Sequence, residues 1–296
     1  MDVEMKIQEP INKVTRKQKL KNYSKHPGSF LLALLTKLAI LLTVLALGFI
    51  LIYILVKGIP NLSTDLFALK YTTENVSMLP AIINTLIITL LSLCIAGPIG
   101  IFSAIYLVEY AKKGNKLVEV VRVTAETLTG IPSIVYGLFG MLFFVTTLKC
   151  GYSLLAGALT LSIMVLPVIM RTTEEALLAV PNSFREGSFG LGAGKLRTIF
   201  KIVLPSAVPG ILAGVILAIG RIVGETAALI YTAGTVAEAA GVMDSGRTLA
   251  IHMYSLSREG LHTNEAYATA VVLLIVVLLI NGLSSLIARK LEAATK

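Results

Sequence analysis

The stretch FREGSFGLGAGKLRTIFKIVLP, residues 184–205, decides the fold because it is polar in a chain that is otherwise strongly apolar. It carries four basic residues and four glycines. The whole sequence of 296 residues is 55% hydrophobic and 15% charged, with a mean hydropathy of +0.83. A soluble domain is nearer to a quarter charged. The composition therefore predicts an integral membrane protein in which residues 184–205 form a loop outside the bilayer.

Six apolar runs are long enough to cross a bilayer, which takes about 20 helical residues. The sequence therefore predicts an all-α integral membrane fold with six transmembrane helices. The runs cover residues 36–56, 79–108, 125–147, 152–170, 206–232 and 267–288. The expected domains are a basic tail (1–35), a first transmembrane helix (36–56), an outer loop (57–77) and a core (78–290) that contains the loop 171–205.

The distribution of Lys and Arg orients these spans, because basic residues concentrate in cytoplasmic segments. With the N-terminus inside, 19 of the 26 basic residues fall in inner segments and five in outer ones. The predicted topology thus has both termini and the loop 171–205 in the cytoplasm. The same asymmetry accounts for the net charge of +9 without a nucleic-acid partner.

Within the loop 171–205, the pattern predicts two short helices. Phe184, Leu191 and Leu196 alternate with charged residues, as in an amphipathic helix. The glycines at 190, 192 and 194 interrupt it, since Gly costs about 1 kcal/mol inside a helix. Such a helix can lie on the lipid surface or dock into a groove of a soluble partner.

The spacing of the segment is similar to the EAA signature of ABC importer permeases, which reads Glu-Ala-Ala, three residues, Gly, nine residues, Ile-x-Leu-Pro. Here it reads Glu186-Gly187-Ser188, Gly192, Ile202 and Leu204-Pro205 at the same spacings, with Gly and Ser in place of the alanines. In that family the segment is the coupling helix that docks on an ATPase. The resemblance therefore assigns ATPase coupling to Arg185, Glu186, Gly187, Ser188, Gly192, Leu204 and Pro205.

Three further stretches resemble the A-type permease subunits of phosphate-specific (Pst) ABC importers. They are ETLTGIPSIVYGLFG (126–140), LPVIMRTTEEALLAVPNSFREGS (166–188) and GRIVGETAALIYTAG (220–234). The resemblance implies a type I ABC importer permease fold in a prokaryotic plasma membrane. It implies as partners a second, C-type permease, a dimer of ATP-binding subunits and an external phosphate-binding protein.

Two charged residues lie inside the fifth span, where an ionisable side chain costs at least about 2.5–3.5 kcal/mol. Arg221 and Glu225 are four residues apart, so they share a helical face and can neutralise each other. Alternatively, Arg221 meets the transported anion, because a guanidinium fork matches phosphate oxygens. The family resemblance favours this substrate pathway and extends it to Thr226.

Other polar groups are expected to be structural. Arg122 with Glu126, and Arg171 with the two glutamates after it, lie at inner helix ends. His252 and His262 in the outer loop are expected at the surface, where the stretch RTLAIHMYSLSREG has helical spacing. Cys94 and Cys150 are expected as buried apolar side chains that form no disulfide.

The chain has no Gly-x-x-x-x-Gly-Lys-Ser/Thr phosphate-binding loop, and no catalytic motif is found. We expect no cofactor or metal on this chain, and ATP with magnesium to be used by a partner ATPase. Two alternatives stay open. The chain could carry another oxyanion such as sulfate, or it could be a gradient-driven anion carrier, although carriers commonly show repeated halves.

Overall fold

The computed structural model describes residues 27–112 and 114–295, and within these residues every regular element is a helix. The chain divides into two compact units, Met1–Ile54 and Leu55–Lys296. The first unit holds most of α2 (Pro27–Gly58), whose apolar side chains are exposed all round. A helix that is hydrophobic on every side is typical of a membrane span.

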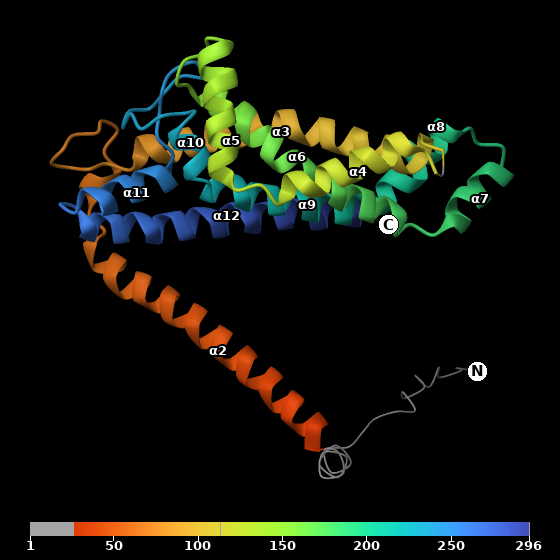
Figure 1. Cartoon of the computed structure of the whole chain (residues 1–296), viewed down its shortest axis with the longest axis horizontal. Coiled ribbons are helices and arrows are strands. Elements are labelled where there is room, and N and C mark those ends of the chain that lie inside the picture. Colours follow the sequence, from red (N-terminus) through yellow and green to blue (C-terminus); the bar gives the residue numbers. More distant parts are fainter. Residues whose placement is uncertain (1–26, 113, 296) are drawn as a thin grey trace. The chain divides into compact units, whose positions relative to one another are not determined.

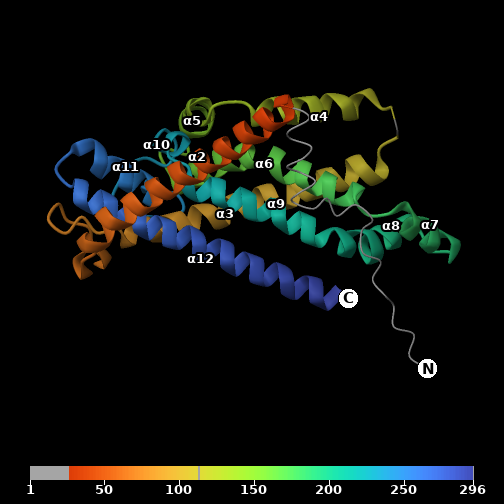
Figure 2. The same ribbon diagram turned by 90° about the horizontal axis from the view of Figure 1, so that it is seen from below.

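The second unit is built on four long helices that run side by side in Figures 1 and 2. They are α3 (Leu79–Ile105), α6 (Leu154–Leu178), α9 (Leu204–Gly224) and α12 (Thr263–Thr295). Helix α6 is the central one, because it packs against both α3 and α9. With α2, these make five helices that are long and apolar enough to span a membrane.

Shorter helices connect the long ones. The α-helices among them are α4 (Lys116–Thr129), α5 (Ser133–Gly140), α7 (Asn182–Gly190), α8 (Lys195–Thr198), α10 (Ala227–Ile230) and α11 (Leu249–Glu259). Single turns of 3-10 helix are η1 (Ile59–Asn61) and η2 (Thr64–Phe67). The π-helical segments are η3 (Tyr106–Tyr110), η4 (Met141–Thr147) and η5 (Ile199–Val203).

The predicted third span, 125–147, is not one straight helix. It consists of α4 and of α5 continued by η4, which meet at an angle of 103°. The break falls at Gly130-Ile131-Pro132, where Pro132 has no N–H to continue the helix and restricts the residue before it. Counting this bent pair as one span brings the number of spans to six.

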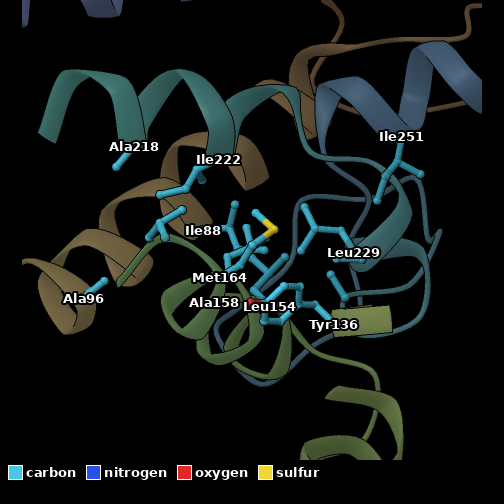
Figure 3. Close-up of a cluster of buried hydrophobic side chains, with 14 of the residues drawn as sticks. Ile88, Ala96, Tyr136, Leu154, Ala158, Met164, Ala218, Ile222, Leu229 and Ile251 are labelled. Atoms are coloured by element: carbon cyan, nitrogen blue, oxygen red, sulfur yellow. The ribbon is translucent and has the colours of Figure 1, made fainter. Parts of the chain in front are cut away.

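The core of the second unit lies where α3, α5, α6 and α9 meet. Figure 3 shows Ile88, Met164 and Ile222 pointing into the same buried cluster. Small residues allow the helices to approach closely: a Cβ on Gly140 would lie 2.2 Å from the Thr160 hydroxyl. Close packing of small residues is the main source of helix association in a membrane.

The two ends of the second unit are different. Helices α7 and α8 lie at one end, and the C-terminal end of α12 points in the same direction (Figures 1 and 2). Helices α10 and α11, with the connection between them, lie at the opposite end. The unit therefore separates the EAA-like segment from the loop that the sequence predicts to be external.

Candidate functional site

Arg221 lies in the last turn of α9 and is half-buried. The predicted ion pair with Glu225 is absent, because α9 ends at Gly224 and Glu225 is extended, with φ −73° and ψ 130°. The Glu225 carboxylate instead accepts a hydrogen bond of 3.1 Å from the Ala228 N–H, at the start of α10. Within the described part of the chain, Arg221 therefore makes no hydrogen bond and no ion pair.

Thr226, the third predicted pathway residue, lies in the same break between α9 and α10. Its hydroxyl is 3.4 Å from the Gly224 carbonyl oxygen. The structure thus brings the three predicted pathway residues together at one interruption of the helix, but it separates the charge of Arg221 from the carboxylate. Sequence spacing alone could not show this, because the i,i+4 relation holds only while the helix continues.

A cavity of 310 Å³ opens between α4 and α6. Its lining combines two arginines and three glutamates with apolar side chains. The lining residues are Arg122, Ala125, Glu126, Thr129, Pro167, Met170, Arg171, Glu174, Glu175 and Leu178. The charged residues that the sequence places at inner helix ends thus share one cavity.

These charges pair across the cavity as well as along one helix. Arg122 of α4 lies 2.5 Å from Glu174 of α6, and Arg171 of α6 lies 3.5 Å from Glu126 of α4. Arg171 also reaches Glu175, one turn further along α6, at 3.2 Å. Most of these side chains are half-exposed or more, so each pair is worth about 1 kcal/mol or less. The network can therefore hold α4 to α6 and still separate when the helices move.

The register of α6 and α9 places Arg221 level with the middle of α6. A Cβ on Gly210 would meet Ala176, and a Cβ on Gly214 would meet Thr172, so the two helices run antiparallel. Arg221 is seven residues past Gly214, about 10 Å further along the axis, and therefore about level with Val165 of α6. Arg221 itself does not line the cavity, and neither do Thr172 and Ala176, which face α9.

Tyr136 of α5 connects the same region to α4. Its hydroxyl donates a 2.8 Å hydrogen bond to the Leu128 carbonyl oxygen, next to the cavity residue Thr129. Tyr136 also lies within the electrostatic field of Arg221. Tyr136 therefore lies between the region of Arg221 and the α4 side of the cavity, and no carboxylate of the described chain pairs with Arg221.

The EAA-like segment folds as predicted, into two short helices with a glycine turn. Helix α7 follows Pro181, and Gly192 has φ +81°, a conformation that favours glycine. The segment exposes apolar side chains at the end of the unit: Phe184, Phe189 and Leu191, the last with 91% of its surface accessible. Such side chains are typical of a docking surface.

Arg185 does not belong to this exposed surface. Its Nε and Nη2 donate to one oxygen of Glu109 in η3, at 3.0 and 2.7 Å, and both partners are largely buried. Nη1 and Nη2 of Arg185 also donate hydrogen bonds to the carbonyl oxygens of Val180 and Leu177, near the end of α6. Arg185 therefore fastens α7 to the spans. The sequence analysis did not identify Glu109. A carboxylate at the end of an apolar run, next to a basic loop, could have predicted this ion pair.

The remaining residues of the segment divide into exposed and structural ones. Glu186 and Gly187 are exposed. Ser188 is buried, and its hydroxyl lies 2.8 Å from that of Thr198, which joins α7 to α8. Leu204 and Pro205 form the first turn of α9, where Pro needs no N–H partner.

Two expectations about single residues were wrong. His252 of α11 is fully buried rather than at the surface, and its ring stands edge-on to Tyr71. Cys94 is exposed in this chain, because it lies on the face of α3 that is turned away from the bundle. Both cysteines are free.

This arrangement is that of a type I ABC importer permease. The structure resembles a bacterial alginate ABC transporter with a TM-score of 0.67 at 16% identity, over 91% of this chain and 98% of that one. It resembles the MetNI methionine transporter with a TM-score of 0.56 at 22% identity, over 72% and 94% of the two chains. Sequence identities this low are evidence for a shared fold and for nothing further.

The sequence itself places the chain in a family. The profile described as "Binding-protein-dependent transport system inner membrane component" matches residues 96–296. The chain is 33% identical over 264 residues to the probable ABC transporter permease protein YqgI of Bacillus subtilis, covering 81% of this chain and 90% of that protein. It is 42% identical over 205 residues to the phosphate transport system permease protein PstA of Pasteurella multocida, covering 69% and 72%.

The chain belongs to this family of binding-protein-dependent permeases. It is a multi-pass membrane subunit of a bacterial ABC importer, and its relatives are permease subunits rather than enzymes.

Proposed function

We propose that the chain forms half of the transmembrane pathway for inorganic phosphate in an ATP-driven importer of the bacterial plasma membrane. The relatives in Pasteurella multocida and in Haemophilus influenzae, the latter 35% identical over 218 residues, are named phosphate transport system permeases. Their names concern those proteins, and for this chain the substrate rests on the chemistry of its own site.

The observation that carries the proposal is the state of Arg221. The two arginines of the cavity, Arg122 and Arg171, are each held by carboxylates. Arg221 has no such partner in the described chain, and a guanidinium stays charged in a protein. A phosphate that reaches this point meets an available fork of donors.

Coupling would pass through α7. Its exposed apolar residues offer a surface to a partner ATPase, which uses ATP and magnesium, and Arg185 transmits the movement to Glu109 and to the end of α6. Since α6 also carries one half of the cavity's ion pairs, a pull on α7 would open or close the cavity between α4 and α6. A second, C-type permease would supply the other half of the pathway, and an external phosphate-binding protein would deliver the ion.

The test is uptake of labelled phosphate into vesicles reconstituted with this chain and its co-encoded partners, with and without ATP on the coupling side. We expect ATP-dependent uptake that sulfate does not inhibit, and its loss in Arg221→Gln while the complex still assembles. Arg258→Gln, which removes an arginine from the far end of α11, serves as the matched control and keeps full uptake.

The alternatives give different results. ATP-driven uptake of sulfate in place of phosphate would keep the architecture and change the substrate. Uptake driven by an ion gradient without ATP would make α7 a lipid-surface helix and overturn the coupling role. Full uptake by Arg221→Gln would remove Arg221 from the pathway.

A further inference from the structure

Unsatisfied buried polar atoms concentrate at the start of α11. In the part of the chain that the structure describes, seven buried side-chain nitrogen or oxygen atoms have no hydrogen-bond partner. Three of them belong to two neighbouring residues, namely Nε and Nη2 of Arg247 and the hydroxyl of Thr248. Both ring nitrogens of His252 also lack a hydrogen bond of regular geometry, although the ring interacts with the Val76 backbone. Native proteins contain few such atoms, and each calls for an explanation.

The three residues surround one region. The Arg247 guanidinium lies 4.6 Å from the centre of the Tyr71 ring, and the His252 ring stands edge-on to the same tyrosine at 6.3 Å. Thr248 is the N-cap of α11, but its side chain makes no capping hydrogen bond. Its neighbour Leu249 donates its N–H to Thr85 of α3, at 2.8 Å, which fixes the helix start.

The charge balance of this region is positive. Arg247 is 6% exposed and His252 0% exposed, and no carboxylate of the described residues lies within ion-pair distance of Arg247. An arginine cannot lose its proton in a protein, and a buried charge without a partner is costly. The cation–π contact with Tyr71 offsets only part of this cost. The Arg247 guanidinium and the Thr248 hydroxyl therefore lack an acceptor, whereas the His252 ring has the Val76 backbone as a hydrogen-bond partner.

We propose that Arg247 and Thr248, beside the His252 ring, form a binding site for a small phosphate-type oxyanion, at the end of the unit opposite α7. The guanidinium supplies charge and two donors, and the hydroxyl supplies one more. The N-terminus of α11, an 11-residue helix, adds its positive dipole end. This site is separate from Arg221 and does not depend on which solute the chain transports.

Size and burial favour a small ion over a protein side chain. A carboxylate attached to a partner's backbone could not reach Nε of Arg247 or the ring of His252 through the 6% of Arg247 that is exposed. The flanking connection is held by hydrogen bonds between the Asn84 side chain and the backbone of Glu238, Ala240 and Arg247, so an inorganic ion would enter when these bonds open locally. A phospholipid headgroup offers the same oxyanion chemistry, so the experiment has to separate the two sources.

The experiment follows the histidine ring nitrogens by NMR in the full-length chain labelled with ¹⁵N-histidine. The chain has three histidines, and His252→Gln assigns the relevant signal. In a phosphate-free maltoside detergent, inorganic phosphate is expected to shift the His252 signal in a saturable way. A shift in phospholipid nanodiscs without added phosphate would identify a headgroup as the source of the same chemistry.

Arg247→Gln is expected to weaken the phosphate response at least about tenfold, since it removes a charge-assisted hydrogen bond. The His262 signal reports whether this variant is folded. Arg258→Gln, in the last turn of the same helix, is the matched control and keeps the response, and so does Arg221→Gln. A His252 signal that ignores both phosphate and phospholipid, or a response that disappears in Arg221→Gln, would overturn the site.

Discussion

At the scale of single residues, His252 gives a pH-dependent signature. Burial and, to a lesser extent, the charge of Arg247 lower the pKa of His252 to about 3, from 6.5. Between these values the unfolded chain binds a proton that the folded chain does not. The contribution of His252 to the free energy of unfolding is therefore complete above pH 6.5. It decreases by about 1.4 kcal/mol for each pH unit below that value.

The measurement is the thermal midpoint of the purified chain in detergent between pH 7 and 4, in a buffer without phosphate or sulfate. We expect His252→Gln to have a shallower decline toward acid than the wild type, because the histidine's proton uptake on unfolding is gone. His262→Gln, at a histidine on the same end of the molecule, keeps the wild-type decline. Parallel declines in all three proteins would contradict the neutral, buried state of His252.

The same residues show where prediction from sequence ends. Arg221 was identified because a cation inside an apolar run is costly wherever it points. Its relation to Glu225 depended on the helix continuing for one more residue, which it does not. The burial of His252 depends on Tyr71, which is far away in sequence. The chemistry of each residue could be predicted from the local sequence. Its partners in the fold could not, because they depend on where helices end and on residues far away in the chain.

At the scale of helices, two glycines of α9, Gly210 and Gly220, have different environments. A Cβ on Gly210 would lie 2.6 Å from the Cβ of Ala176 in α6, whereas a Cβ on Gly220 would have no neighbour within 4 Å. Overpacking costs about 1–3 kcal/mol, and replacing Gly by Ala in a helix gains about 1 kcal/mol. We expect Gly210→Ala to lower the thermal midpoint of the isolated chain and Gly220→Ala to keep or raise it.

Equal losses in the two variants would mean that α6 and α9 do not pack in this register, and the level of Arg221 along α6 would then be wrong. The sequence shows both glycines but cannot tell which one faces α6. It also treated residues 125–147 as one span, although Gly130 and Pro132 were present to signal the break. Hydropathy counts apolar residues and is insensitive to a bend of 103°.

At the scale of the whole molecule, the second unit has two ends, and the predicted topology assigns one to each side of the membrane. The argument from Lys and Arg puts α7 in the cytoplasm and the connection before α11 outside. Leu191, 91% exposed, and Met243, 59% exposed, are reporters for the two ends. Cys94 and Cys150 are first replaced by alanine, because a free exposed thiol would react as well.

We expect a membrane-impermeant maleimide to label Met243→Cys in intact cells, and to label Leu191→Cys only in inverted vesicles. The reverse pattern would place α7 outside the cell, where no ATP is available. The ion pair between Arg185 and Glu109 could then not transmit the movement of an ATPase to the spans. The expected pattern places α7 on one face and the Arg247 cluster on the other. An anion entering from outside would then pass the Arg247 end of the unit before it reaches Arg221 in the last turn of α9, and α7 would lie on the side where the anion is released.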